Sequence, residues 1–200
     1  MPKKVSPDER LVEIAQATLR VAERDGANAV TIRSVAAEMG RTPIVVTHYV
    51  PTRAKLLANA VQYAVDDFHS VIDERMEAVP EEDRFRERAL ALTVAVDSSA
   101  YPAVDKLTLE LMAKSVKGEG LEAFRDDGRR EREDSRAAAH AAGIADPDFA
   151  AELMYLVTAG VVAAEMVDPE LWTPERVKAV VERLVDVLGA PALELHETAG

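Results

Sequence analysis

The stretch TIRSVAAEMGRTPIVVTHYVPTR, residues 31–53, decides the fold of this chain. Apolar residues recur at helical spacing over 31–38, Gly40 interrupts the pattern, and a second short helical segment follows over 42–48. Two short helices joined by a tight turn that contains glycine are the local pattern of a helix-turn-helix, in which the second helix enters the major groove of DNA. The sequence therefore predicts such a helix pair near the N-terminus.

Helix-start and helix-stop signals extend this pattern along the whole chain. Ser, Thr or Asp caps a helix start, and a proline directly after it costs nothing because its missing N–H would have no partner there. Such starts occur at Ser6-Pro7, Thr42-Pro43, Asp146-Pro147 and Thr173-Pro174, and glycine stops occur at Gly26, Gly40, Gly143 and Gly189. No segment shows sustained alternation of period two. We predict an all-α fold of about nine helices, at residues 7–24, 31–38, 42–48, 52–78, 82–98, 102–117, 119–142, 147–167 and 174–188.

Charge is distributed unevenly between the two ends of the chain. The net charge is −12, yet residues 1–57 carry nine Lys or Arg against six Asp or Glu, a net +3 that leaves −15 for the remainder. A basic head on an acidic body favours approach of the head alone to phosphates. We expect a helix-turn-helix DNA-binding domain over 1–52 and a helical effector-binding and dimerisation domain over 53–200, joined by the long helix 52–78.

About fifty N-terminal residues resemble the TetR/AcrR family of transcriptional regulators. The matching positions, in order, are Gly26, Thr31, Val35-Ala36, Gly40, Thr42, His48-Tyr49, Pro51-Thr52-Arg53 and Leu56-Leu57. The chain departs from the commonest pattern at Ile44, Val45, Val46 and Thr47, where a small residue, Thr, Leu and Tyr are usual. Arg41 replaces a usual valine, and Arg53 stands where lysine is usual. The resemblance implies a homodimeric repressor that a small-molecule effector releases from a palindromic operator in double-stranded DNA.

Placing residues 42–48 in the major groove assigns roles to the surrounding side chains. The positions expected to face base edges are Arg41, Thr42, Pro43 and Ile44, with Thr47 and His48 one turn further on. Phosphate contacts are expected at the helix starts capped by Thr31, Thr42 and Thr52 and from Arg33, His48, Tyr49, Arg53 and Lys55. Arginine reads guanine with two hydrogen bonds, and an apolar side chain packs on a thymine methyl group. The threonines would cap helices with or without DNA, and Tyr49 is equally suited to packing on the core of the head.

The last two helices combine apolar faces with small residues, which favours pairing with a second copy in a four-helix interface. The residues expected at this interface are Phe149, Leu153, Leu156, Gly160, Val161, Ala164, Val177, Val181, Leu184, Val185 and Leu188. Coverage of the monomer's own core is the alternative. An effector pocket, as the resemblance implies, would be lined by Tyr63, Leu92, Val96, Leu107, Leu111, Met112, Phe124, Met154 and Val157, although Leu and Met at helical spacing are more often ordinary core.

Other functional classes find little support in the sequence. There is no cysteine, and the four histidines are scattered without metal-ligand spacing, so we predict no catalytic residues, metal or cofactor. The charged N-terminus is unlike a signal peptide, and no stretch approaches ~18 uncharged apolar residues, so we expect a cytoplasmic protein that makes no membrane contact. One alternative stays open: a helical dimer that binds a ligand or a protein without sequence-specific recognition of DNA.

Overall fold

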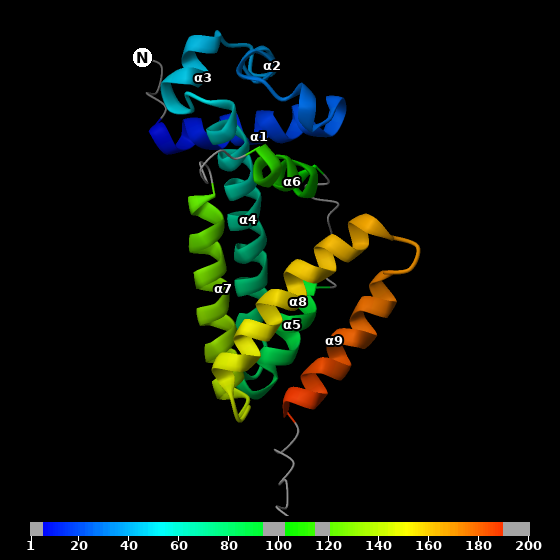
Figure 1. The fold of residues 1–200 in the computed structure, drawn as a ribbon. Helices are drawn as coiled ribbons and strands as arrows, with labels where there is room; N and C mark the ends of the chain where they lie inside the picture. The colour runs from blue at the N-terminus through cyan, green and yellow to red at the C-terminus, as the bar shows by residue number, and fades with distance from the viewer. Residues whose placement is uncertain (1–5, 94–102, 115–120, 190–200) are drawn as a thin grey trace, which may run out of the picture. The chain divides into compact units, whose positions relative to one another are not determined.

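The computed structural model describes residues 6–93, 103–114 and 121–189, and these residues form an all-α fold, as the sequence predicts (Figure 1). The helices are α1 (Pro7–Asp25), α2 (Ile32–Glu38), α3 (Pro43–Tyr49), α4 (Arg53–Glu77), α5 (Arg84–Thr93), α6 (Val104–Lys114), α7 (Glu122–Ala141), α8 (Pro147–Val167) and α9 (Pro174–Gly189). Two single-turn 3-10 helices, η1 (Ala27–Ala29) and η2 (Glu81–Asp83), were not predicted. The predicted ends of the helices at 82–98, 102–117 and 119–142 fall partly outside the described residues.

The predicted capping residues explain where several helices begin. The Ser6 hydroxyl accepts a hydrogen bond from the Glu9 N–H at 3.1 Å, and the Glu9 carboxylate accepts one from the Ser6 N–H at 2.7 Å. Asp146 accepts from the Phe149 N–H at 3.0 Å in the same manner at the start of α8. These side chains satisfy N–H groups that have no partner within the helix. The local sequence thus sets the helix boundaries.

The chain packs as two compact units. Of the described residues, the first contains 6–71, 103–114 and 121–127, and the second contains 72–93 and 128–189, so α4 and α7 each contribute to both. In the first unit α6 completes the core of the head, because Leu107 and Leu111 are buried in one cluster with Ile14, Val35 and Val46 of α1, α2 and α3. The predicted functional boundary at residue 52 stays a prediction. The hydrophobic core of the head includes residues of α4 and α6, which follow that boundary.

The second unit has its own core, in which α5 packs on both α8 and α9. Phe85 of α5, Met154 of α8 and Val181 of α9 are almost fully buried in one cluster. Gly128 of α7 lies close to the Tyr155 ring of α8, and a Cβ at this position would lie 2.8 Å from the tyrosine hydroxyl oxygen unless the ring shifted.

Helix α8 exposes much of its apolar surface. By length and composition it is the one described helix apolar enough to cross a membrane, yet a core helix of a soluble protein passes the same test. Phe149 is 53 % exposed, Leu156 65 % and Val167 86 %. An exposed apolar stripe of this kind is typical of a surface that contacts another protein, a membrane or a ligand.

Candidate nucleic-acid interface

Helices α2 and α3 form the predicted helix-turn-helix. Gly40 takes a φ of 62°, which is the left-handed region that glycine enters without strain. The Arg41 N–H then reaches back to the Ala36 carbonyl at 2.8 Å and closes the turn. On the inner side Val35 and Val46 are completely buried, so the two helices pack on α1 and α4 through these side chains. This packing leaves the outer face of α3 to solvent.

The outer face of α3 carries the side chains that the sequence assigns to base contacts. Ile44 is 78 % exposed, which is costly for an isoleucine and is typical of a recognition surface. Arg41, Thr42, Pro43, Thr47 and His48 are exposed as well. Among the described residues the Arg41 side chain has no hydrogen-bond or ion-pair partner. Thr42 occupies the N-cap position of α3 without a side-chain cap bond.

The surroundings of α3 favour an anionic partner. No Asp or Glu occurs between Met39 and Val65, while Arg41, Arg53 and Lys55 lie in this interval. Arg33 and Lys55 are exposed, as a phosphate contact requires. Tyr49 is half-buried against the core of the first unit and stacks edge-on with His48 at a centroid distance of 4.9 Å. The Tyr49 ring thus packs on the core, as one of its two predicted roles requires, and a phosphate contact by its hydroxyl stays a prediction.

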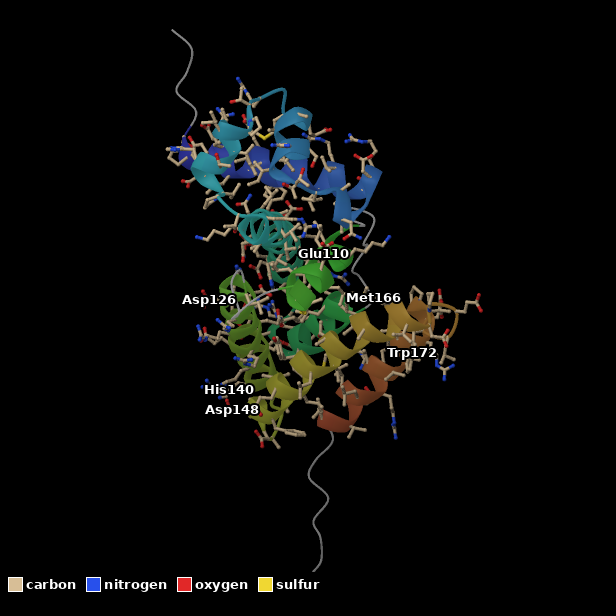
Figure 2. The ribbon with its side chains drawn as sticks, turned by 45° about the horizontal axis from the view of Figure 1, so that its top comes forward. Glu110, Asp126, His140, Asp148, Met166 and Trp172 are labelled. Carbon is tan, nitrogen blue, oxygen red and sulfur yellow. The ribbon has the colours of Figure 1, made fainter. Side chains whose placement is uncertain are left out.

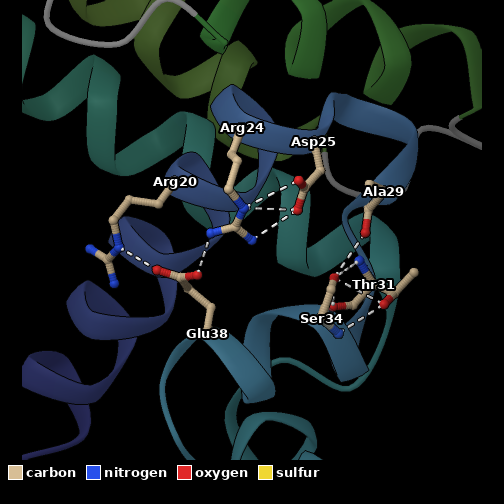
Figure 3. A network of polar contacts seen from close by, with 7 residues as sticks. All are labelled: Arg20, Arg24, Asp25, Ala29, Thr31, Ser34 and Glu38. Carbon is tan, nitrogen blue, oxygen red and sulfur yellow. Dashed lines mark hydrogen bonds and ion pairs between the residues drawn. The ribbon is translucent and has the colours of Figure 1, made fainter.

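Thr31 is engaged within the head. Its hydroxyl accepts from the Ser34 N–H at 3.0 Å, and the Ser34 hydroxyl oxygen accepts from the Thr31 N–H at 2.8 Å (Figure 3). Ser34 also donates to the Ala29 carbonyl at 2.8 Å. This reciprocal cap fixes the start of α2, and a phosphate contact by Thr31 stays a prediction.

Arg53 differs most from its expected role. Its guanidinium donates to the backbone carbonyls of Ala27 and Val30 and forms an ion pair with Glu110 of α6. A phosphate would have to compete with these protein oxygens. The sequence pattern carried no signal for the ion pair, because its two members lie in helices that periodicity alone does not bring together.

A second polar network joins the last turn of α1 to the end of α2. The Glu38 carboxylate binds Arg20 Nε at 2.9 Å and Arg24 Nη1 at 2.8 Å, and Arg24 also binds Asp25 (Figure 3). Hydrogen bonds from Arg24 and then Arg20 lower the pKa of Glu38 below its ordinary value. Bonds to Asp25 and then Glu38 raise the pKa of Arg24. One carboxylate thus forms ion pairs with two arginines of the head.

We expect the contribution of Glu38 to stability to disappear in acid. Its folded pKa lies below the ordinary value of 4.5, so its stabilising effect is present above that pH and is lost as the pH falls through the folded pKa. The difference in Tm between wild type and Glu38→Gln should therefore shrink below pH 4.5. Glu23→Gln, which alters an exposed carboxylate on α1, is the control. A Tm difference for Glu38→Gln that stays constant with pH would contradict the assignment.

The residues predicted to line an effector pocket are divided between the two units. In the first unit Leu107 and Leu111 are buried, the Tyr63 hydroxyl accepts from Gln16 at 2.9 Å, and Met112 is 52 % exposed. The second unit contains Leu92, Met154 and Val157, of which the first two are buried. Val96 and the side chain of Phe124 lie outside the described residues. The common pocket therefore stays a prediction.

A cleft of about 200 Å³ in the second unit has a different character. It is lined by Arg129, Arg132, Glu133, Arg136, Asp148, Ala151 and Glu152. None of the predicted pocket residues borders it, and its charges balance. In the described part of the chain no group of three His, Asp or Glu side chains is placed to hold a metal ion.

The predicted dimer interface is distributed over core and surface. Val177, Val181 and Val185 are at most 8 % exposed in the core of the second unit, which leaves them unavailable to a partner. Partly buried positions are Leu153, Val161, Ala164, Leu184 and Leu188, and exposed positions are Phe149, Leu156 and Gly160. Val167 and Val187, which the sequence pattern did not assign to the interface, are exposed as well. The apolar surface of α9 that remains open therefore lies beside the buried valines, along Val180, Leu184 and Val187.

Comparison with solved structures identifies proteins of the same fold. A TetR transcription regulator from Haloarcula marismortui matches with a TM-score of 0.77 and 21 % identity, over 90 % of this chain and 98 % of that one. A transcriptional regulator from Rhodococcus sp. Rha1 matches with a TM-score of 0.71 and 20 % identity, over 92 % and 95 % of the two chains. The multidrug binding protein EbrR, complexed with imidazole, matches with a TM-score of 0.68 and 21 % identity, over 96 % of each chain.

Neither protein-family models nor curated protein sequences match this chain. Similarity at this level of identity concerns the arrangement of the backbone. Together with the helix-turn-helix of α2 and α3, it shows that the chain has the all-α fold of the TetR-family transcription regulators.

Proposed function

We propose that this protein is a ligand-responsive transcription regulator that binds DNA as a homodimer and acts as a repressor in the cytoplasm. The observation that carries the proposal is the exposed surface formed by Ile44 of α3 and Arg41 of the turn before it, on a helix whose inner face is buried in the core. A polar and apolar pair of this kind is suited to reading guanine and thymine in the major groove. The fold shared with transcription regulators supports the same conclusion.

The proposed dimer uses the exposed apolar stripe of α8. Phe149, Leu156, Gly160, Ala163 and Val167 follow one another at intervals of three, four and seven residues and are all exposed. This spacing places them on one side of the helix, with small residues in the middle that allow a second helix to approach closely. On α9 the row Val180, Leu184 and Val187 has the same periodicity and adds to this surface. A second copy related by a two-fold axis would bury both rows.

Two copies are also what the recognition helix requires. A seven-residue helix contacts few base pairs, and a symmetric dimer doubles these contacts on half-sites about one helical turn, ~34 Å, apart. The operator should therefore be palindromic. The acidic remainder of the chain would stay away from phosphates, which leaves the head to make the contact.

The first test is selection of bound duplexes from a random pool, followed by titration of the selected duplex with wild type and Arg41→Ala. We expect a palindromic site and a loss of about 1–3 kcal/mol per half-site in the variant, concentrated on the same base position of each half-site. Arg125→Ala removes one exposed arginine from α7 and is the matched control. If no palindrome emerges and binding is weak and independent of sequence, the alternative of a helical ligand- or protein-binding dimer replaces this proposal.

The proposed function includes regulation of DNA binding by a small-molecule effector. Solved relatives of this fold include the imidazole complex of a multidrug binding protein, which supports a small-molecule effector here. If an effector weakens operator binding by some factor, the operator must weaken effector binding by the same factor. Equal operator affinity with and without a saturating effector would remove the ligand-responsive part of the proposal.

A further inference from the structure

Arg53, the first residue of α4, links three elements of the first unit. Its Nε donates to the Val30 carbonyl at 2.7 Å, and its Nη2 donates to the Ala27 carbonyl at 2.8 Å. The same Nη2 lies 2.7 Å from Oε1 of Glu110 on α6, which Figure 2 marks. The Glu110 side chain is only 9 % exposed and that of Arg53 32 %. A single guanidinium thus connects α4, α6 and the η1 segment.

These bonds fix a segment that determines where α2 and α3 lie. The Ala27 carbonyl accepts from the Val30 N–H at 3.2 Å as well as from Arg53, and the Val30 carbonyl lies just after η1, where the planar fork of the arginine supplies a second donor. Val30 is followed directly by Thr31, the cap of α2, and α2 packs on α3. Any displacement of η1 therefore moves the recognition surface. Glu110 binds the same Nη2 that donates to the Ala27 carbonyl and so holds the guanidinium in place.

We propose that Arg53 and Glu110 form a clasp that positions the helix-turn-helix for DNA, with both acting as positioning residues rather than as phosphate contacts. This inference rests on the proposed function and adds a specific determinant to it. It also assigns a DNA-related role to an acidic residue of α6, a helix that the sequence places in the effector-binding domain.

The direction in which Glu110→Gln changes DNA affinity distinguishes the clasp from a general effect of net charge. Replacing an acid by a neutral residue ordinarily strengthens binding to a polyanion such as DNA. The clasp requires the reverse for Glu110→Gln, because the neutral amide holds Arg53 less strongly than the carboxylate does. Glu23→Gln removes an acid from the exposed surface of α1 and reports the charge effect alone.

The experiment measures affinity for the selected operator, and its salt dependence, for wild type and four variants: Glu110→Gln, Arg53→Ala, Arg53→Lys and Glu23→Gln. We expect Glu110→Gln to bind about tenfold more weakly, the effect of losing one charge-assisted bond, with an unchanged salt slope. Arg53→Ala should also bind at least about tenfold more weakly without a change in slope. Glu23→Gln should bind as tightly as wild type or more tightly.

Phosphate contact by Arg53 predicts a different pattern. Arg53→Ala would then reduce the magnitude of the salt slope by about 0.9 per copy, roughly 1.8 for the dimer, and Arg53→Lys, which keeps the charge, would bind like wild type. The clasp predicts weaker binding by Arg53→Lys at an unchanged slope, because lysine lacks the fork. Circular dichroism melting verifies that each variant is folded. If Glu110→Gln does not fold, the affinity and salt slope of Arg53→Lys distinguish the clasp from a phosphate contact.

The outcomes separate this inference from the proposed function. If wild type binds the operator and Glu110→Gln binds as tightly as Glu23→Gln, the clasp is overturned and the regulator remains. A reduced salt slope for Arg53→Ala would have the same meaning. If wild type binds no duplex specifically, the proposed function fails, and a role in positioning for DNA fails with it.

Discussion

Glu131→Ala is expected to lower the free energy of unfolding by about 3 kcal/mol, because it leaves the Arg88 guanidinium buried without its main counter-charge. Arg88 of α5 and Glu131 of α7 are 5 % and 6 % exposed, and two hydrogen bonds of 2.8 and 3.2 Å join them. Burial alone would lower the pKa of Arg88, but the bond to Glu131 and the nearby acids raise it. Asp134, at 3.2 Å, retains part of the attraction, which places the effect at the lower end of the usual range.

Urea unfolding at a fixed protein concentration measures this loss, since the stability of a dimer depends on concentration. Glu133→Ala changes an exposed carboxylate on the same helix and should stay within about 0.5 kcal/mol of wild type. The double variant Arg88→Met with Glu131→Met should recover most of the loss, because an apolar pair needs no desolvated charges. A decrease below about 1 kcal/mol for Glu131→Ala would show that the pair is solvated and not a buried anchor.

Leu156→Arg is expected to convert the protein to a monomer and to weaken operator binding by about 10²–10⁴-fold. Leu156 is 65 % exposed in the middle of the α8 stripe, so a two-fold axis there brings two added charges together in an apolar interface. In a dimer, binding of one head holds the second head at a high effective concentration near its half-site. A monomer lacks this gain in affinity, and its loss is the expected weakening of operator binding. Analytical ultracentrifugation and operator titration measure the two effects on the same sample.

Val71→Arg provides the matched control for this experiment. Val71 is also an exposed apolar residue, at 60 %, but it lies on α4 and outside the α8 stripe. We expect this variant to remain a dimer and to retain its thermal stability. If Leu156→Arg sediments as a dimer at concentrations where wild type does, the α8 stripe is not the interface, and another surface must bring the copies together.

The sequence predicts those parts of the fold that depend on neighbouring residues. Caps such as Ser6, Asp146 and Gly40 act over one turn of helix, so the predicted starts and stops of the described helices are close to the observed ones. The pairing of α2 with α3 follows from the same local turn. Exposure of the outer face of α3 could also be predicted, because the apolar residues of α3 are too few to cover more than one buried side.

The remaining features depend on which distant segment packs where. Helix α9 has apolar residues on two sides, Val177, Val181 and Val185 on one and Val180 and Val187 on the other. Periodicity finds both sides but does not indicate which one α5 covers, and this is why the predicted interface included the buried valines. In the same way, no local pattern connects Arg53 with Glu110, since the contact exists only after α6 has packed on η1.

The participation of α6 in the core of the head affects how this protein can be divided in the laboratory or by recombination. A fragment that ends at residue 52 lacks Leu56, Leu57, Leu107 and Leu111, all of which fill that core. It would expose the inner faces of α1, α2 and α3 to water and would tend to aggregate. The segment that completes the head returns from almost fifty residues further along the chain. Exchange of DNA specificity with another regulator would therefore require replacing the surface of α3 alone and retaining the native scaffold beneath it.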